Sequence, residues 1–316
     1  MNYLVTGGAG FIGSNYVRML LTDQLGPVRS VKVLDKLTYA GSLDNLAAIS
    51  HDPRFTFING DICDEAIVNS SVHKGDILVH FAAESHVDRS ISGPSEFIRT
   101  NVQGTQVLLS NAVEKEVKIF LHVSTDEVYG SVEVGSSVET DALLPNSPYA
   151  ASKAASDLLV RSYVETYGLD ARITRCCNNF GANQFPEKFI PLAIKNLQEG
   201  QKIPIYGDGM NIREWIHVEE HCSRLQSVIN FGRRGEIYNL GSGLSMSNVQ
   251  LVEKILNAFS VNFDEYVEFV PDRPGHDVRY SLNTEKFNKL IASNSVDHSG
   301  DKVSKLLDFL KESASR

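Results

Sequence analysis

The chain has 316 residues, which is long enough for one large domain or for a large and a small one. Its 42% hydrophobic and 22% charged residues are ordinary for a globular protein, and its net charge of −9 argues against a nucleic-acid partner that needs a basic face. The sequence contains no apolar run of the ~18 residues that a membrane span needs, so we expect no membrane partner.

The N-terminal residues and the cysteines both favour the cytoplasm. The start MNYLVTGGAG predicts a strand at once and leaves no room for a signal peptide. None of the four cysteines forms a C-x-x-C pair or lies at zinc spacing with histidines, so we expect reduced thiols and no metal site. They are Cys63, Cys176, Cys177 and Cys222.

The first half of the chain alternates short apolar runs with longer amphipathic stretches. The runs are continuous, as in strands of a parallel sheet buried on both faces, and helices are predicted between them, for instance over 14–25 and 95–116. Strand and helix in alternation predict right-handed βαβ units and an α/β fold with a doubly wound parallel sheet of the Rossmann type. The predicted strands cover 3–6, 30–35, 55–58, 76–83, 119–124 and 171–176.

From about Asn178 glycine, proline and aromatic residues become frequent and strand signals sparse, which predicts a smaller second lobe. We expect residues 1–177 to form the large domain, with returning segments near 214–241, and 178–316 to form mainly the smaller lobe. Further helices are predicted over 218–231 and 247–259.

A glycine loop follows the first predicted strand. In TGGAGFIGS, Gly7, Gly10 and Gly13 permit a tight turn and a close approach of the backbone to a pyrophosphate at the start of a helix. Asp35 ends the second predicted strand 22 positions beyond Gly13, where a carboxylate binds ribose hydroxyls and favours NAD over NADP. Lys36 follows and could soften that preference. The turn at residues 60–62 could hold the adenine or be a simple turn.

A Tyr-x-x-x-Lys pair follows a predicted helix start. In NSPYAASKAASDLLV, Ser147 is a plausible N-cap and Pro148 a favoured first residue. Tyr149 and Lys153 are four residues apart on one helical face. An ammonium near the phenol would lower the pKa of the phenol and make it a usable base. From the spacing alone, a packed tyrosine and an exposed lysine without a role in catalysis are the more frequent outcome. The glycine loop upstream makes the catalytic interpretation the favoured one.

The loop, the Tyr-x-x-x-Lys pair and the hydroxyl residues upstream of it resemble the extended short-chain dehydrogenase/reductase superfamily. The stretches LDKLTYAGSLDNL, HFAAESHVDRS, STDEVYG and QFPEKFIP resemble, more specifically, the dTDP-glucose 4,6-dehydratase family, almost unbroken from residue 1 to about 284. The resemblance implies a Rossmann fold with a C-terminal nucleotide-sugar-binding lobe, bound NAD, dTDP-glucose as substrate and a homodimer. The candidate dimer helices lie near 95–115 and 148–167.

The resemblance also explains STDEVY, where two carboxylates end an apolar strand at a cost in free energy. It implies that Tyr149 deprotonates the sugar 4-hydroxyl, with Thr125 beside it and Lys153 as the partner of Tyr149. Glu127 would then remove the C5 proton and a protonated Asp126 would donate to the leaving C6 hydroxyl. Because adjacent strand residues point to opposite faces, we expect the chain to leave strand geometry at Thr125.

The remaining contacts are implied by the resemblance, residue by residue. The cofactor would be bound by Gly7, Gly10, Phe11, Ile12, Gly13, Asp35, Lys36, Thr38, Asp61, Ile62, Ala82, Ala83, Ser85, Thr100, Tyr149, Lys153 and Asn179. The nucleotide sugar would be bound by Ser85, Thr125, Asn178, Lys188, Phe189, Pro204, Tyr206, Arg213, Asn248, Arg273 and His276.

Some positions depart from the resembled family. Cys177, Phe180 and Ala182 replace a usual Ser, Tyr and Pro, and we expect them to border the sugar and the nicotinamide. The chain also ends without the family's Trp/Tyr-rich segment, so the packing of the last helices is not predicted.

Two alternatives are another NAD-dependent nucleotide-sugar enzyme and, from a different class, a non-catalytic binding module. A 4-epimerase shares the loop, the tyrosine and the lysine, but it needs neither a C5 base nor a C6 acid, so Asp126 and Glu127 argue against it. A non-catalytic dinucleotide-sensing module would be expected to lose Tyr149 and Lys153.

Overall fold

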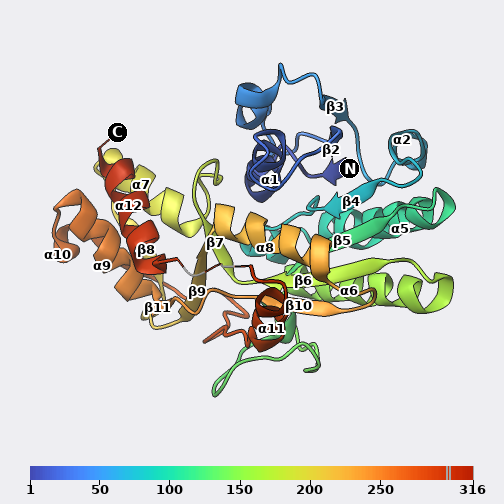
Figure 1. The fold of residues 1–316 in the computed structure, drawn as a ribbon. Helices are drawn as coiled ribbons and strands as arrows, with labels where there is room; N and C mark the ends of the chain where they lie inside the picture. Colours follow the sequence, from blue (N-terminus) through green and yellow to red (C-terminus); the bar gives the residue numbers. More distant parts are fainter. Residues whose placement is uncertain (297, 299, 316) are drawn as a thin grey trace.

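The computed structural model describes residues 1–296, 298 and 300–315, which form a larger and a smaller lobe (Figure 1). The larger lobe contains a seven-stranded sheet of order β10-β6-β5-β4-β1-β2-β3 in which all neighbouring strands are parallel. The predicted doubly wound parallel sheet is therefore confirmed. Its strands are β1 (Asn2–Thr6), β2 (Ser30–Asp35), β3 (Phe55–Asn59), β4 (Ile77–His80), β5 (Ile119–Thr125), β6 (Ala171–Cys176) and β10 (Ile237–Leu240).

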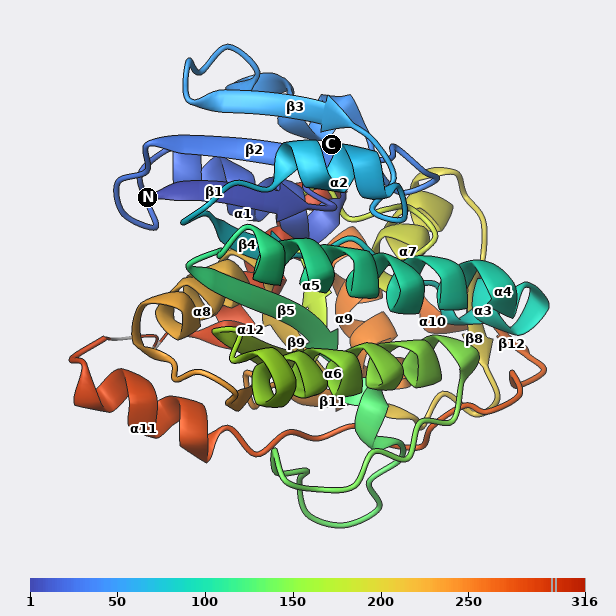
Figure 2. The same ribbon diagram turned by 90° about the vertical axis from the view of Figure 1, so that its right-hand side faces the viewer.

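Helices cover both faces of this sheet. One face carries α1 (Phe11–Leu21), α8 (Val218–Phe231) and α11 (Glu285–Ser293). The other face carries α2 (Glu65–Ser71), α5 (Thr105–Glu114) and α6 (Pro148–Tyr167), and it is turned toward the viewer in Figure 2. Short helices lie in the connections at the carboxyl edge of the sheet: η1 (Leu43–Ile49), α3 (Val87–Ser92) and η3 (Asp126–Tyr129).

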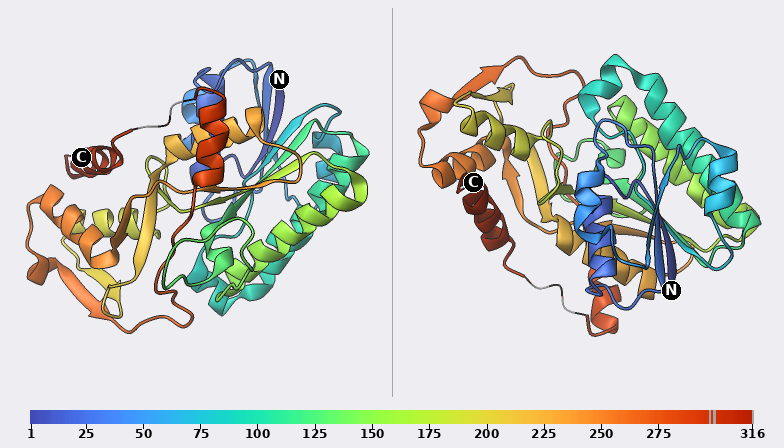
Figure 3. Two further views of the ribbon diagram at one scale, coloured as in Figure 1. Left: turned by 60° about the horizontal axis from the view of Figure 1, so that its bottom comes forward. Right: turned by 90° about the horizontal axis from the view of Figure 1, so that it is seen from above.

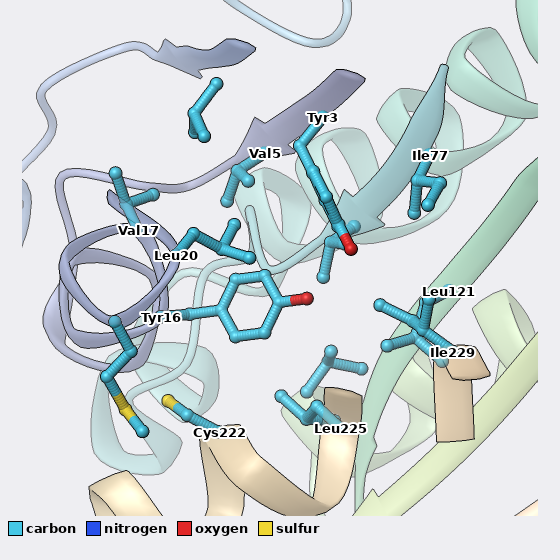
Figure 4. Close-up of a cluster of buried hydrophobic side chains, with 14 of the residues drawn as sticks. Tyr3, Val5, Tyr16, Val17, Leu20, Ile77, Leu121, Cys222, Leu225 and Ile229 are labelled. Atoms are coloured by element: carbon cyan, nitrogen blue, oxygen red, sulfur yellow. The ribbon is translucent and has the colours of Figure 1, made fainter. Parts of the chain in front are cut away.

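The layer between α1, α8 and the sheet is apolar, with two tyrosine hydroxyls inside it (Figure 4). Tyr16 Oη donates to Gln226 Oε1 at 2.7 Å, and Gln226 Nε2 donates to Tyr3 Oη at 3.0 Å. These bonds satisfy polar atoms that would otherwise be costly to bury. They fix α8, which comes late in the sequence, against the first strand and the first helix.

The smaller lobe has two small sheets, of order β11-β9-β7 and β12-β8. Leu306 and Leu310 of its last helix are fully buried in a core with Phe180 and Trp215, so the atypical C-terminal segment covers this lobe, as Figure 3 also shows. The elements are β7 (Asn178–Phe180), β8 (Ile203–Tyr206), β9 (Ile212–His217), β11 (Ser245–Ser247), β12 (Val267–Val270), α7 (Phe189–Gln198), α9 (Asn248–Phe259), α10 (Phe263–Tyr266) and α12 (Lys302–Ala314).

Some predicted boundaries were wrong. The helix predicted over 95–116 is divided into α4 (Pro94–Phe97), the π-helical η2 (Ile98–Gly104) and α5. Within η2 the buried Asn101 amide donates to Glu84 O at 3.0 Å and to Ser152 Oγ at 2.8 Å, and such local widening often places a side chain for function. The strand predicted over 76–83 ends at His80, because the next residues line a cavity. The first helix begins three residues earlier than predicted.

None of the helices in the described part of the chain combines the length and the apolar character that crossing a membrane requires.

Candidate active site

A cavity of about 340 Å³ opens at the carboxyl edge of the seven-stranded sheet. It lies beside the ends of β1 and β4, where the strand order reverses, which is the position at which doubly wound sheets bind ligands. The smaller lobe contributes the opposite wall through β7, the loop that follows it and the start of α7.

The glycine loop forms the floor of the cavity. Gly7 has φ +70°, and a Cβ atom there would lie 2.5 Å from the backbone nitrogen of Ala82. A Cβ atom on Gly13 would lie 2.3 Å from Gly7 O, so only glycine fits this turn. No side chain caps the following helix α1 at Gly10, so first-turn N–H groups can bind an anion.

Asp35 lies at the end of β2 and also lines the cavity. Its Oδ2 accepts the Ala9 N–H at 2.9 Å and its Oδ1 accepts the Leu37 N–H at 2.8 Å. Burial raises the pKa of Asp35, and these two bonds oppose the rise. Lys36 Nζ lies 2.9 Å from Asp61 Oδ2, so its charge is paired with that carboxylate.

Thr125, Asp126 and Glu127 adopt the geometry that was expected. Strand β5 ends at Thr125, which caps η3 by accepting the Glu127 N–H at 3.3 Å. The predicted departure from strand geometry at Thr125 is confirmed, and both carboxyl groups line the cavity.

The two carboxyl groups lie in different electrostatic surroundings. Burial, and next the charge of Glu127, raises the pKa of Asp126 well above its usual value. Burial also raises the pKa of Glu127, but Arg273 and Lys188 oppose that rise. Asp126 is thus the better placed of the two to stay protonated.

Helix α6 presents Tyr149 and Lys153 to the same cavity. Ser147 caps it by accepting the Ala150 N–H at 3.1 Å, and Pro148 is its first residue, as predicted. Both Tyr149 and Lys153 line the cavity and are buried.

The expectation that Lys153 lowers the pKa of Tyr149 was wrong for this structure. Lys153 Nζ donates to Val123 O at 2.9 Å, and burial lowers the pKa of Lys153 to about 8. Burial, and next the charge of Glu127, raises the pKa of Tyr149 well above 10. A hydrogen bond with Thr125 opposes this rise without reversing it.

The cavity brings together every residue predicted for the cofactor and for catalysis. Of the residues predicted for the sugar nucleotide, those that line it are Ser85, Thr125, Asn178, Lys188 and Phe189. The others lie outside its lining, and we call them the outer group: Pro204, Tyr206, Arg213, Asn248, Arg273 and His276.

Two members of the outer group meet at α3. Tyr206 Oη donates to Asp88 Oδ2 at 3.4 Å, and Arg273 Nη1 lies 3.6 Å from Asp88 Oδ1. The ring of His276 lies 6.2 Å from that of Tyr206, centroid to centroid. This contact joins the smaller lobe to α3 next to the cavity.

Arg213 is buried below this group. It donates through Nη2 to Asp277 O at 2.9 Å, with its guanidinium carbon 4.3 Å from the centroid of the Tyr280 ring. Arg213, Arg273 and Lys188 all lower the pKa of Glu127, which places the outer group at the Glu127 end of the cavity.

The lining residues that sequence reasoning missed include two with a buried polar atom that could bind a ligand. Trp215 Nε1 and Gln184 Oε1 are buried and have no hydrogen-bond partner among the described residues. The signal for Trp215 was its being the single tryptophan of the chain, two positions after Arg213.

Two of the three departures lie away from the cavity, contrary to expectation. Cys177 lines it, but Phe180 packs in the smaller lobe against Phe309, with ring centroids 5.9 Å apart. Ala182 is exposed, and its carbonyl accepts from Asn15 Nδ2 at 2.8 Å. Phe180 is buried because β7 turns its side chain into the lobe core.

Comparison with known proteins gives consistent matches over nearly the whole chain. The family model described as GDP-mannose 4,6 dehydratase matches residues 4–292. A dTDP-glucose 4,6-dehydratase of Streptomyces antibioticus is 54% identical over 289 residues, which cover 90% of this chain and 85% of the relative.

Solved structures share the fold as well. The dTDP-glucose 4,6-dehydratase DesIV of Streptomyces venezuelae, solved with NAD bound, has a TM-score of 0.94 at 50% identity, covering 98% of this chain and 96% of that one. A UDP-N-acetylglucosamine 4-epimerase of Methanobrevibacter ruminantium has a TM-score of 0.87 at 29% identity, covering 99% and 97%. The fold alone therefore does not separate dehydratase from epimerase.

Proposed function

Because the chain belongs to the dTDP-glucose 4,6-dehydratase family, we propose that it converts dTDP-glucose to dTDP-4-keto-6-deoxyglucose in deoxysugar biosynthesis. The observation that carries the proposal is the presence of Asp126 and Glu127 in one cavity with Tyr149 and Lys153. Oxidation of the sugar needs only Tyr149 and Lys153, whereas the removal of water also needs an acid and a base such as Asp126 and Glu127.

The cavity fits NAD. Only glycine fits at Gly7 and Gly13, and the tight turn leads to the uncapped start of α1, where a pyrophosphate would bind. Asp35 lies where the adenosine ribose would be held. When bound, NAD supplies a hydride acceptor for C4 and afterwards a hydride donor for C6, so it is regenerated in every turnover. Its positively charged oxidised ring would also oppose the effects that raise the pKa of Tyr149.

The side chains divide the proton transfers among them. Tyr149 takes the proton of the sugar 4-hydroxyl, with Thr125 bonded to its phenol. The C4 ketone makes the C5 proton acidic, and Glu127 removes it as the base. Asp126, whose pKa burial and Glu127 raise, donates its proton to the departing C6 hydroxyl as water leaves.

Two further properties are part of the proposal. We expect a homodimer, in which the outer face of α6 meets a second copy. Ala150 and Ala154 are buried on the inner face, while Ala151 and Leu158 are exposed on the other. We also expect the protein to act in the cytoplasm, where free thiols such as its four stay reduced.

One incubation tests the function. Purified protein with dTDP-glucose and no added NAD should form a product lighter by one water, over many turnovers, as measured by mass spectrometry. The Glu127→Gln variant should still oxidise C4 but lose dehydration. A product of unchanged mass containing galactose would support the epimerase, and no reaction with bound NAD would support the sensing module.

A further inference from the structure

Three segments that line the cavity also touch one another at its rim, through side chains that do not line it. Tyr39 belongs to the loop after β2, between two lining residues. Arg89 belongs to α3, which follows the lining residue Ser85. Glu187 belongs to the loop before α7, next to Lys188.

Arg89 joins the other two side chains. Its guanidinium carbon lies 4.1 Å from the centroid of the Tyr39 ring. Its Nη2 and Nε donate to Glu187 Oε2 at 2.8 and 3.1 Å. Tyr39 also packs edge-on against Phe185, with ring centroids 5.6 Å apart. The loop after β2 and the loop before α7 are thereby linked at the rim of one cavity.

Both loops have a defined shape. Each contains a non-glycine residue in the left-handed region, Leu37 with φ 54° and Asn183 with φ 68°. Such a conformation is sparsely populated and persists where surrounding contacts impose it. The Leu37 N–H is held by Asp35 Oδ1 at 2.8 Å, and the second loop is held to α1 through Asn15.

We propose that Tyr39, Arg89 and Glu187 form a clamp that closes these loops over the bound dinucleotide and slows its release. The inference rests on the proposed NAD site. A reaction that regenerates its cofactor needs no exchange, and a cofactor lost midway would strand an oxidised sugar. The clamp acts as a positioning device, because its three side chains lie outside the lining of the cavity.

The rate of NAD release tests the clamp. NAD-loaded protein is desalted into excess alcohol dehydrogenase and ethanol, which convert each released NAD to NADH that is followed by fluorescence. We expect Arg89→Gln to release NAD about ten-fold faster than the wild type, which corresponds to ~1.4 kcal/mol. Arg29→Gln, an exposed arginine at the opposite edge of the sheet, should release at the wild-type rate. Equal rates for Arg89→Gln and the wild type would overturn the clamp.

A double variant tests whether the side chains act together. Tyr39→Ala should also speed release, and Tyr39→Ala with Arg89→Gln should be no faster than the faster single variant. Multiplied effects would contradict one clamp, and melting temperatures verify that the variants fold. Failure of the proposed function gives a different result, namely slow NAD release without loss of water from dTDP-glucose.

Discussion

The hydroxyl of Thr125 lies 3.2 Å from Oδ1 of Asp126, so the residue that caps η3 also binds the neighbouring carboxyl group. The other oxygen of Asp126, Oδ2, is buried without a hydrogen-bond partner among the described residues. An unpaired buried oxygen costs free energy unless a ligand engages it. The substrate's C6 hydroxyl would satisfy it.

Asp126→Asn tests the acid. The amide keeps the shape and can still bond Thr125, but it cannot deliver a carboxylic proton. We expect C4 oxidation to continue and loss of water to fall at least ~100-fold, a usual size for general acid catalysis. Rapid-quench mass spectrometry measures both steps. Asp264→Asn, an exposed acid on α10, serves as the control. Loss of water within ten-fold of the wild type would point to another proton donor.

The raised pKa of Asp126 also predicts a pH-dependent stability. A carboxyl group whose pKa is raised in the folded state contributes stability below its unfolded value of about 3.9, and this contribution is lost as the pH rises through the folded value. Asn does not titrate, so Asp126→Asn should be more stable than the wild type near pH 8. This difference in stability should shrink as the pH falls toward 4. Each unit by which the folded state raises the pKa of Asp126 lowers the free energy of unfolding of the wild type by ~1.4 kcal/mol at high pH, which urea unfolding measures. A pH-independent difference would show that Asp126 titrates normally.

The surroundings of Tyr149 predict a cofactor-dependent ionisation. Nearby carboxyl groups and burial keep the phenol neutral, and a cationic ring in the cavity opposes them. The tyrosinate absorbance of the wild type minus that of Tyr149→Phe should appear at lower pH with NAD than without it. Tyr149→Phe should also slow C4 oxidation by ~100-fold or more. An ionisation that NAD does not move would mean that another group activates the phenol.

The sequence predicted the sheet and the cofactor loop because both depend on local patterns. Continuous apolar runs mark the buried strands, and the glycine spacing determines the turn that Gly7 and Gly13 make. The strand ends bring Asp35 and Thr125 to one edge without any further information. The functional roles of these residues, and the division of the chain at residue 177, stay predictions.

The remaining features depend on contacts between distant parts of the chain. Arg89 and Glu187 are 98 residues apart, and no local pattern pairs them. The same holds for Lys153, whose ammonium bonds the carbonyl of Val123 instead of the phenol one turn away. The burial of Phe180 depends on α12, whose contacts with the smaller lobe could not be predicted from its sequence.

The outer face of α6 predicts how the protein assembles. Leu158 is 57% exposed there, and a two-fold contact would bury it twice. We expect light scattering to give a dimer for the wild type, and Leu158→Glu to raise the dimer Kd by ~100-fold or more, because each buried leucine is worth ~1.5–3 kcal/mol. Leu144→Glu, on a loop and 66% exposed, should stay dimeric. A monomeric wild type, or a dimer that Leu158→Glu leaves intact, would exclude this face as the interface.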